Sequence, residues 1–286
     1  MASGAEDMAG DQGMAAPLRR PYLRQGAPLC FAHRGGAALA PENTLVAYEN
    51  GLAFGADALE LDIHLARDGE LMVIHDETLE RVTDGTGAIR QYTRDELRHF
   101  DAGYRFTRDG GATYPYRGQG ITLPTLREVY ERFPDTRINI DMKDNDPELE
   151  QRLWALLQEF GAEERTLVGS FYPVALARFR RLTAGRVATA AGPAETRNFL
   201  LGHLFRATGW LRPAYDALQA PETHRGIRVV SPGSIYAAHR LGLDVHVWTI
   251  DDRETMDRLL AWGVDGLMSD RPDVLAQALA AFDHNQ

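Results

Sequence analysis

Eight short runs rich in apolar and β-branched residues recur along the sequence, and most of them are separated by a stretch long enough for a helix. The runs lie at about 29–33, 57–65, 137–142, 165–169, 186–190, 227–230, 244–249 and 264–268. Helical periodicity is clearest in the stretches 44–54, 147–159, 173–182 and 252–262. Alternating strands and helices in one sheet give parallel strands with right-handed crossovers, and eight such strands close a barrel. The sequence therefore predicts an α/β protein, a (β/α)8 barrel over residues 29–286.

Two segments depart from this alternation. Residues 76–122 follow the second strand, contain seven glycines and show little apolar periodicity beyond one helical turn at 93–100. This pattern predicts a small inserted segment over one rim of the barrel. Residues 1–28 are rich in Ala and Gly, contain three prolines and lack a periodic apolar pattern. Because such a segment buries too little surface to offset the entropy of ordering, we expect a flexible N-terminal tail.

Charge and composition exclude several classes of protein. The chain has 31 Lys and Arg against 41 Asp and Glu, a net charge of −10, and such a surface repels a phosphate backbone, so we expect no nucleic-acid partner. No apolar run approaches the roughly 18 residues that a transmembrane segment needs. Glu6, Asp7 and Asp11 stand where a secretion signal would have its apolar core, and the single cysteine, Cys30, leaves no intramolecular disulfide. We therefore expect a cytoplasmic protein, and the oligomeric state stays open.

The second predicted strand carries ionisable residues on one face. Glu60, Asp62 and His64 alternate with Leu61 and Ile63, so the three polar side chains share a face. An isolated strand of this kind is amphipathic with one wet face. In a barrel, however, the apolar face packs on the helices and the polar face points into the interior. Two inward carboxylates repel each other unless a proton or a cation holds them, and a hard divalent ion is the usual solution.

The third predicted strand repeats this pattern, with Asp141 and Lys143 on its polar face. Together Glu60, Asp62 and Asp141 supply oxygen donors only, which favours Mg²⁺ or Ca²⁺ over zinc. Lys143 would neutralise the carboxylates or bind an anion beside the metal. A salt bridge at the mouth of the barrel is the alternative explanation.

Two histidines follow strand-like runs. His33 ends the first strand and precedes Arg34 and two glycines, and His75 ends the apolar run 71–74. Because the ends of barrel strands form the active face, a histidine pair there predicts one acid and one base. The Arg34 guanidinium matches phosphate oxygens. A single histidine is more often structural, but a metal, a lysine, an arginine and two histidines together indicate phosphoester chemistry.

The order of these motifs resembles that of the glycerophosphodiester phosphodiesterase family. The resemblance spans about residues 30–275 and depends on His33-Arg34-Gly35-Gly36, Pro41-Glu42-Asn43-Thr44, Glu60-Leu61-Asp62, Asp68-Gly69, His75-Asp76, Leu123-Pro124-Thr125-Leu126, Asn139-Ile140-Asp141-Met142-Lys143, Val247-Trp248-Thr249, Gly263-Val264-Asp265-Gly266 and Asp270-Arg271-Pro272. The family is a TIM barrel with a small insertion after the second barrel strand, so the resemblance implies that fold here.

The resemblance also implies a role for each residue at a matching position. Glu60, Asp62 and Asp141 would bind the divalent cation, His33 and His75 would be the acid and base, and Arg34, Lys143, Asn43 and Trp248 would contact the substrate. Asn43 has an equally good structural explanation as the N-cap of the helix that follows. Asp141 stands where the family usually has Glu, and Asp251 stands where it often has Asn. His64 falls at a variable position and is interpreted either as a site residue or as a rim histidine.

The resemblance implies a metal-dependent hydrolase that cleaves glycerophosphodiesters into an alcohol and glycerol 3-phosphate. The sequence leaves open whether water or a substrate hydroxyl attacks phosphorus, and which histidine is the base. The alternatives are a lysophospholipase D acting on lysophospholipids and a non-catalytic barrel that binds phosphoesters. An aldolase or isomerase is possible on this fold, but the chain has no motif for one.

The long connection at about 193–226 bears on the lipid alternative. Five of its apolar residues lie near one helical face: Leu200, Leu204, Leu211, Tyr215 and Leu218. Any helix that packs on a barrel has such a face, which is the alternative explanation. Phe199, Phe205 and Trp210 widen this apolar surface, and Gly202, Gly209 and Pro213 interrupt it. A broken apolar segment at the active face would hold an acyl chain or rest on a membrane surface. This hypothesis predicts peripheral lipid contact through residues 199–218.

Overall fold

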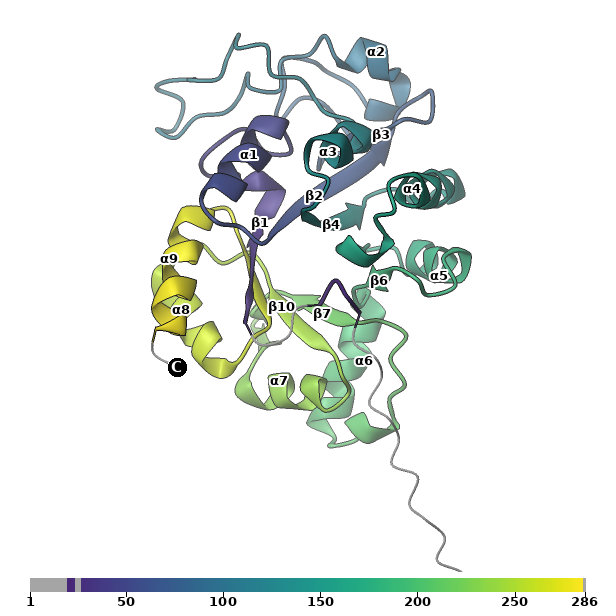
Figure 1. Cartoon of the computed structure of the whole chain (residues 1–286), viewed down its shortest axis with the longest axis vertical. Coiled ribbons are helices and arrows are strands. Elements are labelled where there is room, and N and C mark those ends of the chain that lie inside the picture. The colour runs from purple at the N-terminus through teal and green to yellow at the C-terminus, as the bar shows by residue number, and fades with distance from the viewer. Residues whose placement is uncertain (1–19, 24–26, 285–286) are drawn as a thin grey trace, which may run out of the picture.

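The computed structural model describes residues 20–23 and 27–284 (Figure 1). Most of the predicted flexible tail, residues 1–19 and 24–26, lies outside the described residues. Two residues of that predicted tail are described and are buried: Tyr22 is 0% exposed and Leu23 is 5% exposed. They pack against Leu29, Phe31 and other side chains of the barrel interior. The tail prediction is therefore wrong for this short stretch, because its two large apolar side chains have a core to enter.

Eight parallel strands form the barrel. They are β1 (Leu29–Ala32), β2 (Ala58–Leu65), β4 (Arg137–Met142), β5 (Thr166–Gly169), β6 (Ala188–Thr189), β7 (Ala217–Ala220), β10 (Asp244–Val247) and β11 (Gly266–Ser269). Hydrogen-bonded neighbours follow the order β6-β5-β4-β2-β1-β11-β10-β7, and a parallel bridge between Ala190 and Ala217 joins the two ends of this series. The helices surround the strands in Figure 1. The predicted (β/α)8 barrel is confirmed.

The outer layer consists of helices that alternate with these strands. They are α1 (Leu45–Ala53), α3 (Leu126–Arg132), α4 (Pro147–Glu159), α5 (Pro173–Leu182), α6 (Pro193–Leu204), α7 (Pro232–His239), α8 (Arg253–Trp262) and α9 (Pro272–Asp283). Short 3₁₀ turns lie at η1 (His33–Gly35), η2 (Ile89–Gln91), η3 (Glu163–Arg165) and η4 (Thr208–Trp210). Five of the helices begin with proline, whose missing N–H is not needed in a first turn. No helix in the described part of the chain is long and apolar enough to cross a membrane.

The sixth barrel strand is the one strand position that the sequence interpretation placed wrongly. We expected it at 227–230, but β7 (Ala217–Ala220) pairs with β10 and takes the sixth place. The segment 223–228 instead forms a small antiparallel ribbon of β8 (Thr223–His224) and β9 (Ile227–Arg228). The β7 sequence, Ala-Leu-Gln-Ala, has no β-branched residue, so its strand conformation comes from tertiary pairing rather than from propensity.

The inserted segment after β2 packs around a small apolar core of its own. Residues 76–122 follow β3 (Leu71–Val73), which is antiparallel to β2, and contain η2 and the single helical turn α2 (Arg94–Leu97). The Thr93 side chain accepts from the Glu96 N–H, and the Glu96 side chain accepts from the Thr93 N–H, so this turn begins with a complete capping box. Its core contains Met72, Ile74, Leu79, Ile89 and Leu97, among others. The segment lies at one edge of the barrel, beside α1 and α3 (Figure 1).

The two faces of β2 and β4 divide as their alternation predicts. Leu59, Leu61 and Ile63 belong to the apolar layer between strands and helices. Glu60 and Asp62 make their ion pairs on the other face, with residues from the ends of β1 and β4. The two strands run in register, with Asp62 opposite Asp141. The polar faces of the two strands therefore meet inside the barrel, toward the carboxyl ends of the strands.

Candidate active site

The first histidine lies where β1 ends and the turn η1 begins. His33 Nδ1 is 2.6 Å from Asp270 Oδ1, and its Nε2 is 3.9 Å from Glu60 Oε2. Asp270 is held in turn by Asp251, whose Oδ1 accepts from the Asp270 N–H at 2.8 Å and from the Ser269 hydroxyl at 2.9 Å. The contacts of Asp251 are thus structural: it holds the backbone of Asp270, whose carboxylate contacts His33.

Arg34 bends the chain back toward the carboxylates. Its backbone has φ of 50°, in the left-handed region, and its N–H donates to Glu60 Oε2 at 3.0 Å. The guanidinium lies 3.3 Å from Asp62 Oδ2 through Nε and donates to Glu42 Oε1 at 3.0 Å. Gly35 follows with φ of 86°, and a Cβ there would lie 2.7 Å from the Ala47 backbone, so glycine is required for this turn against α1.

Asn43 reaches into the same cluster. Its Nδ2 donates to Asp62 Oδ2 at 2.9 Å, and its Oδ1 accepts from the Tyr48 hydroxyl at 2.9 Å. The N-cap of α1 is Thr44, whose side chain accepts from the Ala47 N–H. The alternative interpretation of Asn43 as the helix cap is therefore wrong, and Asn43 is a buried residue that orients Asp62.

Lys143 occupies the space between the two aspartates. Its Nζ lies 2.9 Å from Asp62 Oδ1 and 2.7 Å from Asp141 Oδ2. The other Asp141 oxygen, Oδ1, is buried without a hydrogen-bond partner among the described residues. A buried carboxylate oxygen without a partner is costly, and a cation is the simplest way to satisfy it.

The environment shifts the pKa values of the carboxylates in opposite directions. Burial raises the pKa of Glu60 to about 7, and the Asp62 charge adds to the rise. Burial likewise raises the pKa of Asp141. Burial also acts to raise the pKa of Asp62, but the Lys143 and Arg34 charges outweigh it and hold that pKa below the usual value. The cluster therefore needs a proton or an added cation near neutral pH.

The residues present fit a hard divalent cation in their donor chemistry. Three carboxylates from adjacent strands face one region, all donors are oxygens, and one buried oxygen has no partner. As the side chains stand, no three His, Cys, Asp or Glu residues of the described chain converge on a common point for an ion. Lys143 lies where a cation would compete for Asp62 and Asp141, so we expect ion binding to displace its ammonium.

The second histidine lies after β3, at the start of the inserted segment. His75 Nδ1 is 2.6 Å from Asp76 Oδ1. Burial, together with the Lys143 and Arg34 charges, lowers the pKa of His75 despite the Asp62 and Asp76 carboxylates. His33 behaves in the opposite way: burial lowers its pKa, but Glu60 and Asp270 outweigh burial and the net shift is upward. The two histidines are thus biased toward different protonation states.

His64 is a rim histidine, the second of the two interpretations that the sequence left open. Its Nδ1 is 2.7 Å from Asp144 Oδ1 and its Nε2 is 3.1 Å from the backbone oxygen of His75. The other Asp144 oxygen accepts from the Leu65 N–H at 2.8 Å. Both ring nitrogens are therefore engaged in fixing the loop that carries His75.

Aromatic side chains line the mouth beside Lys143. The rings of Phe171 and Trp248 meet edge to face, with centroids 6.2 Å apart, and Lys143 Nζ lies 5.7 Å from the Phe171 ring. Phe171 is 58% exposed and its neighbour Tyr172 is 44% exposed. Large exposed aromatic side chains next to charged residues are typical of a ligand contact. Trp248 therefore lies where a substrate-binding residue would be needed, and Phe171 accompanies it.

The family assignment follows from comparison with known proteins. A model described as the glycerophosphoryl diester phosphodiesterase family matches residues 33–274. The chain belongs to this family. A glycerophosphodiester phosphodiesterase of Caldanaerobacter subterraneus is 32% identical over 254 residues, which cover 86% of this chain and 96% of that protein. One of Bacillus subtilis is 31% identical over 263 residues, covering 86% of this chain and 84% of that protein.

Solved structures of the glycerophosphoryl diester phosphodiesterase family have the same fold. A glycerophosphodiester phosphodiesterase from Agrobacterium tumefaciens superposes with a TM-score of 0.71 at 28% identity, covering 87% of this chain and 99% of that one. An Oleispira antarctica phosphodiesterase in complex with the product sn-glycerol-3-phosphate superposes with a TM-score of 0.70 at 25% identity, covering 89% and 97%. The present chain is therefore an enzyme of the phosphodiester hydrolase class.

Several partners of the site residues were not singled out from the sequence. Asp270 and Asp76 were each quoted only as members of a family motif, with no role of their own. Their signal was present in the motifs His75-Asp76 and Asp270-Arg271-Pro272, because a catalytic histidine commonly has a carboxylate on its second nitrogen. No sequence pattern marked Phe171 or Asp144, because only the fold brings them to the mouth of the barrel.

The segment 199–218 does not lie where the lipid hypothesis placed it. Helix α6 ends at Leu204, Leu218 belongs to β7, and residues 205–216 form a helix-to-strand connection. Such connections lie at the end of a barrel opposite the active face. Asp216 comes directly before the first residue of β7, at the amino end of that strand, and pairs with Arg20 at 3.1 Å. The expectation of an apolar segment at the active face is wrong.

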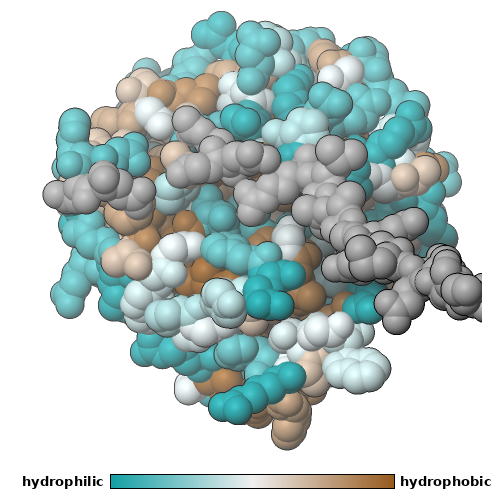
Figure 2. Space-filling view, turned by 60° about the horizontal axis from the view of Figure 1, so that its bottom comes forward, coloured by the Kyte–Doolittle hydropathy of each residue, from teal (hydrophilic) through white to brown (hydrophobic). Residues whose placement is uncertain are grey.

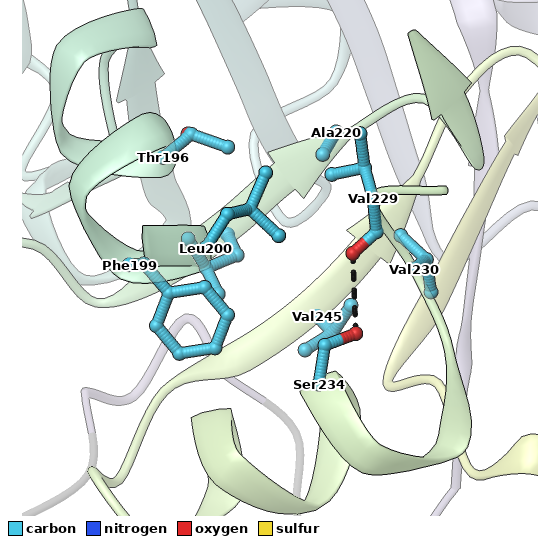
Figure 3. Close-up of a pocket in the computed structure, with 9 residues that line it drawn as sticks. Thr196, Phe199, Leu200, Ala220, Val229, Val230, Ser234 and Val245 are labelled. Carbon is cyan, nitrogen blue, oxygen red and sulfur yellow. Dashed lines mark hydrogen bonds between the residues drawn. The ribbon is translucent and has the colours of Figure 1, made fainter. Parts of the chain in front are cut away.

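The apolar cavity that this segment lines is too small for an acyl chain. Phe199 and Leu200 of α6 line it together with Val229, Val230 and Val245, and the Ser234 hydroxyl donates to the Val229 carbonyl at 3.1 Å (Figure 3). The free volume is about 10 Å³, the room of one water molecule. On the face drawn in Figure 2, hydrophobic residues form small areas separated by hydrophilic ones. The cavity is part of the packed wall of the barrel.

Proposed function

We propose that this enzyme is a metal-dependent phosphodiesterase that cleaves glycerophosphodiesters into an alcohol and glycerol 3-phosphate. The observation that carries the proposal is the pair of histidines after β1 and β3, each with a carboxylate on Nδ1, together with the carboxylate cluster on the inner faces of β2 and β4. The complex of the Oleispira relative with sn-glycerol-3-phosphate supports the identity of the product. The names of the Caldanaerobacter and Bacillus relatives support the substrate class.

Arg34 and Lys143 supply the positive charge that a phosphodiester requires. Both lie against Asp62, and an ion that displaces the Lys143 ammonium from the aspartates would leave its charge available to the phosphate beside Arg34. Fixed donors that meet the charge developing on the non-bridging oxygens usually give the largest share of catalysis. Glu60, Asp62 and Asp141 would hold Mg²⁺ or Ca²⁺, which when bound supplies Lewis-acid stabilisation of the same charge.

The histidines divide the proton transfers. His75, whose pKa is lowered, would be neutral and accept the proton of the attacking hydroxyl. His33, whose pKa is raised, would be protonated and donate its Nε2 proton to the leaving alkoxide oxygen. The new O–P bond forms as the P–O bond to the alcohol breaks. If the attacker is a substrate hydroxyl instead of water, a cyclic phosphate forms first and water opens it in a second cycle.

Glycerophosphocholine and ³¹P NMR test this assignment. We expect the phosphorus signal of glycerol 3-phosphate, with free choline, at a rate that depends on added Mg²⁺ or Ca²⁺. Phosphocholine as the product would mean that the other ester bond is cleaved. Saturable binding without turnover, at any metal concentration, would favour the non-catalytic alternative.

A second substrate class is favoured by the aromatic mouth. The exposed Phe171 and Tyr172 and the partly buried Trp248 form an apolar rim beside Lys143, where an acyl group attached to the glycerol would leave the site. On this basis we keep lysophospholipase D activity as the second candidate. Lysophosphatidylcholine offered as substrate tests it, and lysophosphatidic acid is the expected product. Its absence under conditions where glycerophosphocholine is cleaved would exclude the lipid class.

A further inference from the structure

One arginine of the inserted segment makes contact with two loops of the active site. Arg81 Nε and Nη2 lie 2.5 Å and 3.2 Å from the Asp76 carboxylate. Its Nη1 and Nη2 each lie 2.7 Å from the Glu42 carboxylate. All three guanidinium nitrogens are thus engaged, in a double fork that only arginine can form.

Each of these two carboxylates has a second partner in the catalytic machinery. Asp76 Oδ1 is 2.6 Å from His75 Nδ1, and Glu42 Oε1 accepts from Arg34 at 3.0 Å. The resulting chain of contacts runs from His75 through Asp76, Arg81 and Glu42 to Arg34. It connects the histidine after β3 with the guanidinium after β1 through one side chain that touches neither.

The charges along this chain alternate in sign, so each member stabilises the next. Burial acts to raise the pKa of Glu42, but the bonds to Arg81 and Arg34 outweigh it and the net shift is downward. The same balance lowers the pKa of Asp76 to about 2, with Arg81 as the main opposing partner. Both carboxylates therefore stay ionised and keep their hydrogen bonds to Arg34 and His75 over the neutral pH range.

An ordinary surface ion pair does not connect two parts of an active site in this way. Arg94 belongs to the same inserted segment and pairs with Glu128 at 3.0 Å, with a similar exposure: 35% for Arg94 and 44% for Arg81. Glu128, however, caps α3 and contacts no residue of the site. An exposed pair of that kind contributes little to stability. Arg81 differs from Arg94 in what its carboxylate partners hold, and Arg94 is therefore its matched control.

We propose that Arg81 is a positioning residue that holds Asp76 against His75 and Glu42 against Arg34, so that the inserted segment aligns the proton acceptor with the phosphate-binding arginine. This inference rests on the proposed function. Without Arg81, Asp76 and Glu42 lose the cation between them, and each is free to turn away from its catalytic partner. Loss of a residue that orients a catalytic group typically lowers activity by about 10–100-fold.

Arg81 also lines a cavity, which allows a direct test. The cavity has a volume of about 190 Å³ and lies between the loop before α1 and the inserted segment, with Glu42, Arg105 and Phe106 among its lining residues. In Arg81→Ala, methylguanidinium from solution can enter this space and replace the missing group. Rescue of this kind responds to the guanidinium itself and not to the stability of the fold.

The experiment compares Arg81→Ala, Arg81→Lys and the control Arg94→Ala with glycerophosphocholine as substrate. We expect Arg81→Ala to lower kcat and raise KM, about 10–100-fold in kcat/KM, with a melting temperature close to that of Arg94→Ala. Methylguanidinium should restore a large part of its activity and none in His75→Ala. Arg81→Lys should recover only partly, because an ammonium cannot bind both carboxylates in pairs. Activity of Arg81→Ala within about twofold of the unchanged enzyme, or a loss that methylguanidinium leaves unchanged, would overturn the proposal.

A readout without turnover separates this inference from the proposed function. The proton on His75 Nδ1 is held in a short bond to Asp76 and should give a downfield NMR signal, assigned by its loss in His75→Gln. We expect this signal to weaken or shift in Arg81→Ala and to persist in Arg94→Ala. If the unchanged protein cleaves no glycerophosphodiester yet the signal depends on Arg81, the function fails while the positioning role stands. A signal that is the same in Arg81→Ala contradicts the positioning role itself.

Discussion

Asp62 and Asp141 are register partners on the adjacent parallel strands β2 and β4, and they share one ammonium, the Nζ of Lys143, at 2.9 Å and 2.7 Å. This pairing stabilises two carboxylates that lie side by side inside the barrel. It also places Asp141 Oδ1, the buried oxygen without a partner among the described residues, beside the proposed metal position.

Asp141→Glu should retain activity, within about tenfold of the unchanged enzyme, and lower the metal concentration needed for half-maximal rate. The reason is that the longer side chain reaches further toward the ion, whereas Asp141 stands one methylene short of the glutamate usual in the family. Asp141→Asn is the control and should need more metal. Complete loss of activity in Asp141→Glu would contradict the role of this residue as third ligand.

Metal binding should depend on pH through Glu60. Burial raises the pKa of Glu60 to about 7, so below that pH the carboxyl is protonated and must lose its proton before it binds a cation. We expect the affinity for Ca²⁺ to rise as pH increases through about 7. Calorimetric titration at pH 6 and pH 8 measures this, with release of protons on binding at the lower pH. An affinity that is the same at both pH values would show that Glu60 is not a ligand.

The raised pKa of Glu60 also predicts how the stability of the metal-free protein depends on pH. Because the folded-state pKa of Glu60 is raised above its unfolded value, its contribution to stability is present at low pH and lost as pH rises toward about 7. A fixed Ca²⁺ concentration of 100 times the Kd at pH 8 should restore about 2.7 kcal/mol at that pH, and less at pH 6, where the Kd is higher. The increase in Tm on adding Ca²⁺ should therefore be larger at pH 8 than at pH 6. In Glu60→Gln we expect this difference to disappear, and a difference that remains would assign it to another group.

His33→Ala and His75→Ala should each lower kcat by roughly 10²–10⁴-fold with little change in melting temperature. If the two act as one acid and base pair, the double variant should be no slower than the slower single variant. Steady-state rates and thermal melts on the three proteins provide the measurement. Unfolding of a single variant would mean that its histidine is structural.

The opposite pKa shifts of the two histidines predict a bell-shaped pH profile. His75 must be neutral, so kcat/KM should rise with pH through a pKa below 6.5. His33 must be protonated, so kcat/KM should fall with pH through a pKa above 6.5. Asp270→Asn removes the carboxylate partner of His33 and should move only the alkaline limb to lower pH. Movement of the acid limb instead would reverse the assignment of acid and base.

Lipid selectivity should depend on the mouth of the barrel. Phe171→Ala should raise KM for lysophosphatidylcholine several-fold and leave KM for glycerophosphocholine unchanged, because only the lipid carries an acyl chain to this rim. Phe205→Ala and Trp210→Ala are matched controls: Phe205 is 73% exposed and Trp210 is 88% exposed, and both lie near or in the connection at the opposite end. If these controls alter KM for the lipid and Phe171→Ala does not, the lipid site lies at the opposite end.

The fold and the site differ in how far the sequence could predict them. Seven of the eight barrel strands were located because alternation and β-branched residues mark them. The sixth was missed because Ala217–Ala220 takes its strand form from pairing with β10. Asp62 and Asp141 could be placed on inward faces from alternation alone. That Lys143 would bridge them, and that Arg81 would reach both Glu42 and Asp76, depends on side-chain positions that only packing decides.

The measurement that tests the whole account most directly is glycerol 3-phosphate release from glycerophosphocholine by enzyme stripped of metal and then titrated with Ca²⁺ or Mg²⁺, beside Glu60→Gln. We predict no release from the stripped enzyme, a saturable return of activity with one or both ions, and no return in Glu60→Gln at the same concentrations. Full activity in the stripped enzyme, or equal titration curves for the unchanged enzyme and Glu60→Gln, would contradict the assignment of the carboxylate cluster as the metal site of this phosphodiesterase.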